Sequence, residues 1–330
     1  MLDTSTAEVR FAIQAVQGSA RLIHEIQHQT VKTTMTKEDR SPVTVADFTA
    51  QAFVARLLEQ FFPHVPLVAE ESTDALKSIA GKEILEQVTR HLDQAYGGVS
   101  NADVYNWIEK GNANPAQSYW TLDPLDGTKG FLRGDQFAVA LAYITEQQVQ
   151  IGVLGCPNLI LELEDIRLDE GCLIIAVRGA GTWAASLKDG RSYYPLHVSK
   201  IDQPEKARIL RSYETGHTNV DQVSHFMTAW GVTAPPMILD SQAKYALLAA
   251  GRGEVCLRLL SENQPMYKEK LWDQAAGALI VEEAGGQISD LDGRPLDFSS
   301  GRLLSNNRGI LATNGHLHLS ALGTLRRITA

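Results

Sequence analysis

The chain has 330 residues and a formal net charge of −9. Hydrophobic residues make up 44% of it and charged residues 21%, and both fractions are ordinary for a globular protein. The acidic balance argues against broad binding of nucleic acid or of an anionic membrane, because both need a basic face, whereas a small phosphorylated ligand remains compatible where metal ions reverse the local charge. The length favours two domains, or one domain with two lobes.

The composition also gives an expectation about the compartment. The chain starts without a basic and apolar leader, and no stretch approaches the roughly 18 uninterrupted apolar residues of a membrane span. Cys156, Cys172 and Cys256 lie in apolar, strand-like runs without a C-x-x-C spacing, which predicts buried free thiols and a reducing environment. We therefore expect a cytoplasmic protein with no membrane contact.

Two helices and a short strand open the chain. Helical spacing of apolar residues predicts the first helix: Val9, Ile13, Val16, Ala20 and Ile23. A second helix follows residues 41–44 and ends at Pro63, and Asp47 lies in its opening turn. Its apolar stripe is Val54, Leu57, Leu58 and Phe61. Residues 65–69 read as a buried strand that ends at Glu70-Glu71.

Residues 72–118 show one helical pattern, at 84–92, and we expect a flexible excursion there, with an active-site lid as one option. Strand patterns follow at 119–122, 137–144, 149–155 and 173–177, of which the middle two form an antiparallel hairpin. The last third alternates strands (208–211, 255–259, 310–313) with helices (243–250, 274–283). This organisation predicts an α+β domain at 1–195 with an antiparallel sheet, and a smaller α/β domain at 196–330.

The run Asp123-Pro124-Leu125-Asp126-Gly127-Thr128 carries the strongest chemical signal. Pro124 fixes a turn across which both carboxylates can point at one hard cation, with the Leu125 carbonyl as a further oxygen ligand. Gly127 allows close approach of the backbone, and Thr128 opens a short helix whose N–H groups face an anion. Taken alone, the run favours a capped turn over a metal site, and the single residues Asp47 and Asp273 favour helix caps.

Four runs together resemble the motif series of the inositol monophosphatase superfamily, in its order and approximate spacing: residues 41–47, 68–72, 120–128 and 271–277. Residues 127–139 and 239–245 further resemble its 3′(2′),5′-bisphosphate nucleotidase branch. The resemblance extends from Ala12 to about Gly315 and is weakest at 72–118. It implies a layered α+β / α/β sugar-phosphatase fold, with an antiparallel-sheet N-terminal lobe and a smaller α/β C-terminal lobe. It further implies that the domain at 1–195 binds the metal and that the domain at 196–330 binds the nucleotide.

The resemblance also implies a site with two to three Mg²⁺ ions. The implied metal ligands are Glu70, Asp123, Asp126, Asp273 and the Leu125 carbonyl, with Glu71 near a third, weaker ion. Asp47 and Thr128 would form a pair that orients a metal-activated water and helps to deprotonate it. The N–H groups of Gly127 and Thr128 would hold phosphoryl oxygens.

A nucleotide bisphosphate also has a second phosphate and a nucleobase, and the protein must contact both. Ser241 caps a predicted helix whose first turn holds Lys244, an arrangement that favours an anion, and Arg258 ends a strand. His217 matches a family position that approaches the nucleotide. The residues alone favour a solvated surface lysine for Lys244, a structural ion pair for Arg258 and a loop histidine for His217, and only the resemblance favours binding roles.

The resulting expectation is a Mg²⁺-dependent phosphomonoesterase that converts adenosine 3′,5′-bisphosphate to AMP and phosphate, with the sulfate-activated analogue as a second substrate. The resemblance also implies lithium sensitivity and a place in sulfur metabolism. The alternatives are an inositol mono- or polyphosphate phosphatase with the same metal site, and a non-catalytic sensor of metal or nucleotide. We expect a small-molecule partner, no nucleic acid, and a monomer or weak homo-oligomer.

Overall fold

The structure is a computed structural model and describes residues 2–28, 34–36, 42–213, 220–260, 264 and 266–329. Its larger sheet has seven strands, in the spatial order β11 (Tyr194–Leu196), β10 (Gly181–Ser186), β9 (Cys172–Val177), β6 (Gln148–Cys156), β5 (Ala138–Thr145), β4 (Ser118–Asp126) and β3 (Leu67–Ala69). All neighbouring strands are antiparallel except β3 and β4, which are parallel. The predicted hairpin is confirmed, because Thr145 of β5 pairs with Gln148 of β6.

Helices cover both faces of this sheet. The helices nearest to it are α1 (Ala7–His28), α2 (Val45–Phe61), α7 (Ala243–Ala249) and α8 (Ala275–Glu283). Side chains alternate along each strand, so Val139 and Leu141 of β5 pack on the side of α1 and α2, whereas Ala140 and Ala142 face α7 and α8. Gly152 of β6 allows α8 to approach closely, because a Cβ there would lie 2.7 Å from the Ala276 carbonyl oxygen.

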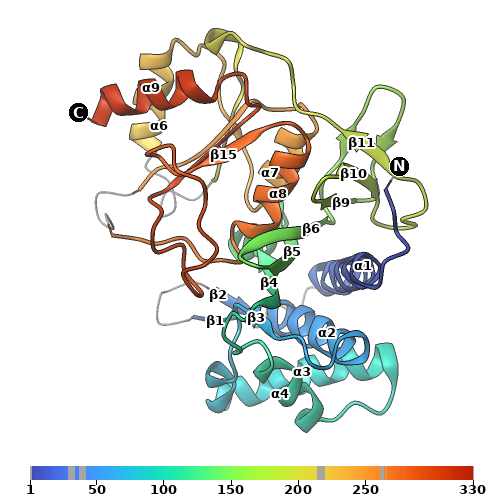
Figure 1. Ribbon diagram of the computed structural model, residues 1–330. Coiled ribbons are helices and arrows are strands. Elements are labelled where there is room, and N and C mark those ends of the chain that lie inside the picture. Colours follow the sequence, from blue (N-terminus) through green and yellow to red (C-terminus); the bar gives the residue numbers. More distant parts are fainter. Residues whose placement is uncertain are drawn as a thin grey trace.

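The second sheet has five strands, in the order β13 (Met237–Ile238), β12 (Ile209–Arg211), β14 (Val255–Arg258), β16 (Ile310–Thr313) and β15 (Gln287–Ser289). Helices α6 (Val220–Trp230) and α9 (His318–Thr329) pack on its outer face. Figure 1 shows α7 and α8 between the two sheets, so the layers run helices, seven-stranded sheet, helices, five-stranded sheet, helices. The predicted layered fold is confirmed.

The remaining elements are short or lie at the rim: β1 (Thr34–Thr36), β2 (Pro42–Thr44), η1 (Thr73–Lys77), α3 (Ile79–Tyr96), α4 (Asn101–Glu109), α5 (Thr128–Arg133), β7 (Leu161–Glu162), β8 (Arg167–Leu168) and η2 (Pro204–Lys206). The flexible excursion predicted at 72–118 is wrong. Helices α3 and α4 pack on α2 around a core of their own (Figure 1). The nine-residue α4 escaped prediction because it buries only Val104 and Ile108, too short a pattern to read, although Ser100 and Asp103 form a capping box at its start.

The domain boundary near residue 195 stays a prediction. Leu196 ends the last strand of the larger sheet, and Ile209 begins the first strand of the smaller one. Helix α8 nevertheless comes from the C-terminal part of the chain and packs against β5, β6 and β9. The two parts therefore share the helical layer that lies between the sheets.

The cysteine prediction is confirmed, because Cys156, Cys172 and Cys256 are all buried and free. Burial raises the pKa of the Cys172 thiol to about 12, so this side chain packs as a neutral group. No helix in the described ranges combines the length and apolar character needed to cross a membrane.

Candidate active site

The end of β4 carries the two aspartates of the central motif. Strand β4 continues through Asp126, and its pairing with β5 passes from Asp123–Ala140 to Asp126–Ala138, which leaves one extra residue in β4. The predicted tight turn is therefore wrong, and a β-bulge takes its place. Pro124 lacks an N–H group and so cannot join the ladder at this point. The bulge is held by the Leu125 N–H, which donates to Asp123 Oδ1 at 3.1 Å.

Gly127 connects this bulge to α5. Its φ of 89° lies in the left-handed region, and a Cβ at this position would stand 3.1 Å from the Ser241 Cβ. The chain can therefore turn sharply into α5 and bring Ser241 close to the motif. The predicted short helix at Thr128 is confirmed, and it ends at Arg133.

Thr128 and Asp47 lie together, as the resemblance implied. The Thr128 hydroxyl donates to the Leu125 carbonyl at 3.1 Å and stands 3.4 Å from Asp47 Oδ1. Asp47 is buried in the first turn of α2. Because the hydroxyl has one proton and two acceptors, it can turn between the carbonyl and the carboxylate.

Carboxylates from four elements gather around Asp123. Burial raises the pKa of Asp123 well above its usual value, and the negative charges of Glu70, Asp126, Asp273 and Asp47 add to this shift. Burial likewise raises the pKa of Asp126 and, more strongly, that of Asp273. Hard oxygen donors that repel one another in a buried place fit a divalent cation such as Mg²⁺.

These side chains still stand apart. Within the described residues, no three His, Cys, Asp or Glu side chains converge closely enough to hold a metal ion as they stand. Mutually repelling carboxylates are expected to spread, and a cation would draw them inward. The ligand set therefore stays a prediction, supported by the negative charge of its members and by the burial of Asp123 at their centre.

Glu71 is held through its main chain. Its N–H donates to Gln51 Oε1 at 2.9 Å, and its carbonyl accepts from Gln51 Nε2 at 2.8 Å. Gln51 lies one helical turn after Asp47 on α2, so one helix positions both the Asp47 carboxylate and the strand end at Glu70-Glu71. Gln51 was not predicted, and its spacing of four residues from Asp47 is the signal that could have found it.

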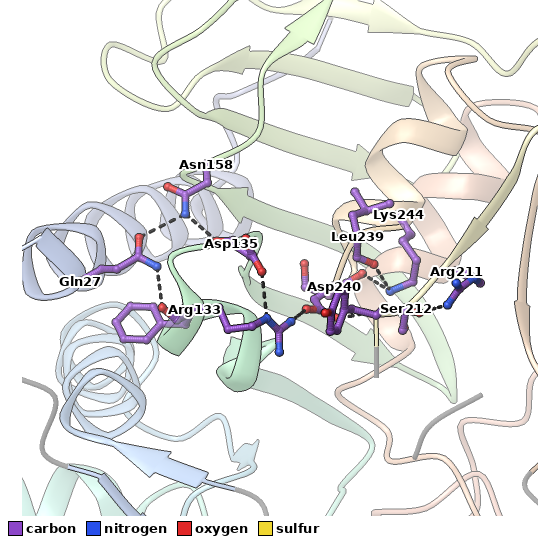
Figure 2. Close-up of polar contacts among 12 residues, drawn as sticks. Gln27, Arg133, Asp135, Asn158, Arg211, Ser212, Leu239, Asp240 and Lys244 are labelled. Atoms are coloured by element: carbon purple, nitrogen blue, oxygen red, sulfur yellow. Dashed lines mark hydrogen bonds and ion pairs between the residues drawn. The ribbon is translucent and has the colours of Figure 1, made fainter. Parts of the chain in front are cut away.

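Lys244 is not a solvated surface lysine. Its ammonium group donates to the carbonyls of Ser241 at 2.7 Å and Leu239 at 3.4 Å (Figure 2). Burial lowers the pKa of Lys244, and the charge of Asp126 opposes this shift. The positive charge of Lys244 in turn counteracts the rise in the pKa of Asp126. Lys244 therefore forms a cationic edge beside the carboxylates.

The helix that carries Lys244 begins where it was predicted to begin, but Ser241, its predicted cap, does not stand at the cap position. Helix α7 starts at Ala243 with Gln242 at the cap position, and Ser241 precedes it with a φ of 68°. The Ser241 hydroxyl accepts from the Ala243 N–H at 3.2 Å. Helix α8 begins at Ala275, one residue after the start predicted for the helix 274–283.

Arg258 ends β14 as predicted and forms an ion pair. Its Nε lies 2.9 Å from Glu269 Oε1, and its guanidinium also lies 3.7 Å from Asp273 Oδ2. Burial disfavours the charge, but Glu269, Tyr267 and Asp273 outweigh it and raise the pKa of Arg258. Arg258 is thus a structural ion pair that also borders the carboxylate cluster. Glu269 was missed because nothing in its local sequence marks it as buried.

Further contacts between distant segments were also missed. The Gln242 N–H donates to Asp126 Oδ2, and the Gln242 amide bonds to Trp272 and Gly277, so one residue links β4, α7 and α8. Figure 2 shows Arg133 of α5 between Asp135 and Asp240. His217 lies outside the described residues.

Comparison with known proteins places the chain in a family. Residues 3–329 match the family model described as inositol monophosphatase family, and the chain belongs to this family. Its fold is similar to that of an inositol monophosphatase (IMPase) from Thermotoga maritima, with a TM-score of 0.69 and 21% identity over 98% of each chain. Members of this family are metal-dependent, generally on Mg²⁺.

Curated relatives narrow the comparison. The chain is 39% identical to a 3′(2′),5′-bisphosphate nucleotidase of Oryza sativa, over 96% of this chain and 92% of the relative. It is 36% identical to a protein of the same name from Schizosaccharomyces pombe, over 93% and 91%. The similarity to these relatives extends over nearly the whole chain.

Proposed function

We propose that this enzyme is a phosphomonoesterase that removes the 3′-phosphate of adenosine 3′,5′-bisphosphate and releases AMP and phosphate. The observation that carries the proposal is the pairing of two charge types in one place. The carboxylates around the buried Asp123 include Asp126, which feels the positive charges of Lys244 and Arg258. They also include Asp273, whose Oδ2 lies 3.7 Å from the Arg258 guanidinium. Carboxylates suit a metal at the reacting phosphate, and cations suit a second phosphate that is not cleaved.

The proposed metal is Mg²⁺, in two to three positions. Its ligands would be Glu70, Asp123, Asp126, Asp273 and the Leu125 carbonyl, with Glu71 near a further ion. Bound Mg²⁺ neutralises phosphoryl charge and makes water a better nucleophile at neutral pH.

Asp47 and Thr128 would handle the proton of the attacking water. The Thr128 hydroxyl is a weak base alone, but with Asp47 Oδ1 at 3.4 Å it can pass a proton to a carboxylate. The main-chain N–H groups of Gly127 and Thr128 would hold phosphoryl oxygens as charge develops on them. The water oxygen then bonds to phosphorus, the bond to the 3′-oxygen breaks, and that oxygen takes a proton from solvent. This direct route forms no phosphoenzyme.

Ser241, Lys244, Arg258 and His217 would bind the rest of the nucleotide. The 5′-phosphate fits the edge formed by Lys244, and the sulfate-activated analogue differs only at that end, which makes it a second substrate. The names of the Oryza sativa and Schizosaccharomyces pombe relatives support this choice of substrate class. The partner is then a small molecule.

An inositol phosphate phosphatase is the second candidate, because the family model and the Thermotoga maritima structure both carry that name. The cationic edge disfavours it, since a single-phosphate substrate has no second anion to place there. The two candidates share the metal ligands and differ only in the use made of Lys244.

Product analysis tests the proposal. Incubation with adenosine 3′,5′-bisphosphate and Mg²⁺ should yield 5′-AMP and phosphate in equal amounts. A chelator should stop the reaction, added Mg²⁺ should restore it, and Asp126→Ala should abolish it. Release of the 5′-phosphate, or turnover that survives Asp126→Ala, would contradict the proposal.

A further inference from the structure

Arg302 connects two segments that each precede a predicted metal ligand. It lies in the loop between β15 and β16, half-buried, and its guanidinium donates to three main-chain carbonyls. Two of them belong to Gly111, at 3.3 Å, and Ala113, at 3.0 Å. The third is the carbonyl of Ala69, the last residue of β3, directly before Glu70.

The surrounding backbone strengthens this attachment. The Ala69 N–H donates to the Gly111 carbonyl at 2.9 Å, so Arg302 binds both partners of an existing pair. These bonds attach the end of β3 to the loop at 111–113. They thereby fix the position of the main chain just before Glu70.

The other side of Arg302 contacts the segment of Asp273. Its guanidinium carbon lies 4.9 Å from the centre of the Trp272 ring, and its carbonyl accepts from the Leu271 N–H at 3.0 Å. A stacked guanidinium on a buried tryptophan is a favourable cation–π contact. Trp272 directly precedes Asp273, so one side chain joins the segments of two ligands that are about 200 residues apart in the chain.

Only an arginine at position 302 can make all of these contacts. Burial lowers the pKa of Arg302, and no carboxylate in the described ranges forms an ion pair with it. Its planar fork can serve several carbonyls and the ring face at once, which a lysine ammonium group cannot do. An apolar side chain would leave the three carbonyls with one donor fewer each.

We propose that Arg302 is a positioning residue that holds the Glu70 and Asp273 segments at a fixed separation and so sets the affinity of the enzyme for its divalent cation. This inference rests on the proposed metal-dependent function. Arg302 touches neither substrate nor metal in this account. It acts through the main chain at Ala69 and through the Trp272 ring.

The test measures cation affinity without catalysis. Mg²⁺ is titrated into wild type, Arg302→Met and Arg302→Lys in the absence of substrate, and the rise in Tm gives the half-saturating concentration. We expect this concentration to increase roughly 10–100-fold in Arg302→Met, the range seen when supporting partners of metal ligands are removed, and less in Arg302→Lys. Saturating Mg²⁺ should restore most of kcat. Arg308→Met, which removes an exposed arginine from the same loop, should leave the half-saturating concentration unchanged.

The outcomes are distinguishable. A lower Tm before Mg²⁺ is added, together with an unchanged half-saturating concentration in both Arg302 variants, would mean that Arg302 only stabilises the fold and would overturn the inference alone. A wild-type protein that shows neither Mg²⁺-dependent stabilisation nor Mg²⁺-dependent turnover would overturn this inference and the proposed function together. If Arg302→Met fails to fold, Arg302→Lys decides, since its charge is retained.

Discussion

Thr128 has a single hydroxyl proton and two acceptors within reach, the Leu125 carbonyl at 3.1 Å and Asp47 Oδ1 at 3.4 Å. Removing either member of the Thr128–Asp47 pair should therefore remove proton transfer while leaving most substrate contacts in place. For Thr128→Val and Asp47→Asn we expect kcat to fall by about 10²–10⁴-fold, with a small change in KM. Steady-state kinetics on adenosine 3′,5′-bisphosphate checks this.

A matched control for Thr128→Val exists on α2, the helix that carries Asp47. The buried Thr49 hydroxyl donates to the Val45 carbonyl at 2.7 Å, and Thr49→Val should keep kcat within a few-fold of wild type. If Thr128→Val and Thr49→Val behaved alike, the role of the pair in proton transfer would be wrong.

Lys244 should discriminate between substrates with one and two phosphates. Loss of a charged hydrogen bond costs about 1.5–3 kcal/mol, so Lys244→Met should raise KM for adenosine 3′,5′-bisphosphate by roughly 10–100-fold. Adenosine 3′-phosphate lacks the second anion, and its KM should change little. Lys206→Met removes an exposed lysine and serves as the control. An equal loss for both substrates would argue that Lys244 only supports the fold.

The residues of the site could be predicted only where the signal is local. Asp123, Asp126, Gly127 and Thr128 stand in one short run, and Asp47 opens a helix with a readable apolar stripe. The Gln242 N–H reaches Asp126 across 116 residues of sequence, and Arg302 reaches Ala69 across 233. Each of these contacts joins a side chain to a main-chain group that any residue type would offer. Such contacts leave no pattern in the sequence, so Gln242 and Arg302 were missed.

At the scale of elements, His318 ties α9 to the smaller sheet. Its ring nitrogens lie 2.9 Å from the Ser289 hydroxyl of β15 and 3.1 Å from the Thr313 hydroxyl of β16. Burial lowers the pKa of His318 to about 4, below the ordinary value of about 6.5 that it regains on unfolding. The unfolded chain therefore takes up the proton first, and the stability due to the neutral ring is complete above pH 6.5 and is lost as the pH falls toward 4.

Denaturant unfolding at pH 7 and pH 5 measures this effect. We expect the His318 contribution to the free energy of unfolding to fall by about 2 kcal/mol between the two pH values. His318→Gln should be less stable at pH 7 but should lose correspondingly less on acidification. The exposed His316→Gln should follow wild type. Identical pH dependence in all three proteins would show that the ring is not held neutral.

Elements were predictable in proportion to their length and regularity. Helices α1 and α2 carry periodic apolar positions, and the strands β5, β6 and β9 are nearly continuous buried runs. All five were predicted within a few residues. Helix α4 and the strand pair β7–β8 are too short for a period to appear. The bulge in β4 resembles a turn in sequence because Pro124 and Gly127 favour both structures.

At the scale of the molecule, the layers explain why the site lies where it does. Helix α8 follows Asp273 and packs on the larger sheet, which brings this aspartate beside the end of β4. Helix α7, in the layer between the sheets, and strand β14, in the second sheet, bring Lys244 and Arg258 to the same place. The alternation of strands and helices predicted the layers, but it could not place one sheet against the other, because that depends on side-chain packing across the shared helices.

The proposed function requires that the enzyme prefer a nucleotide bisphosphate to an inositol phosphate. The most direct measurement is a competition in which adenosine 3′,5′-bisphosphate and inositol 1-phosphate are present at equal concentration in one tube with Mg²⁺, followed by phosphorus NMR. We expect the 3′-phosphate signal to disappear first, while the 5′-phosphate and the inositol phosphate signals persist. Earlier loss of the inositol phosphate signal would contradict it.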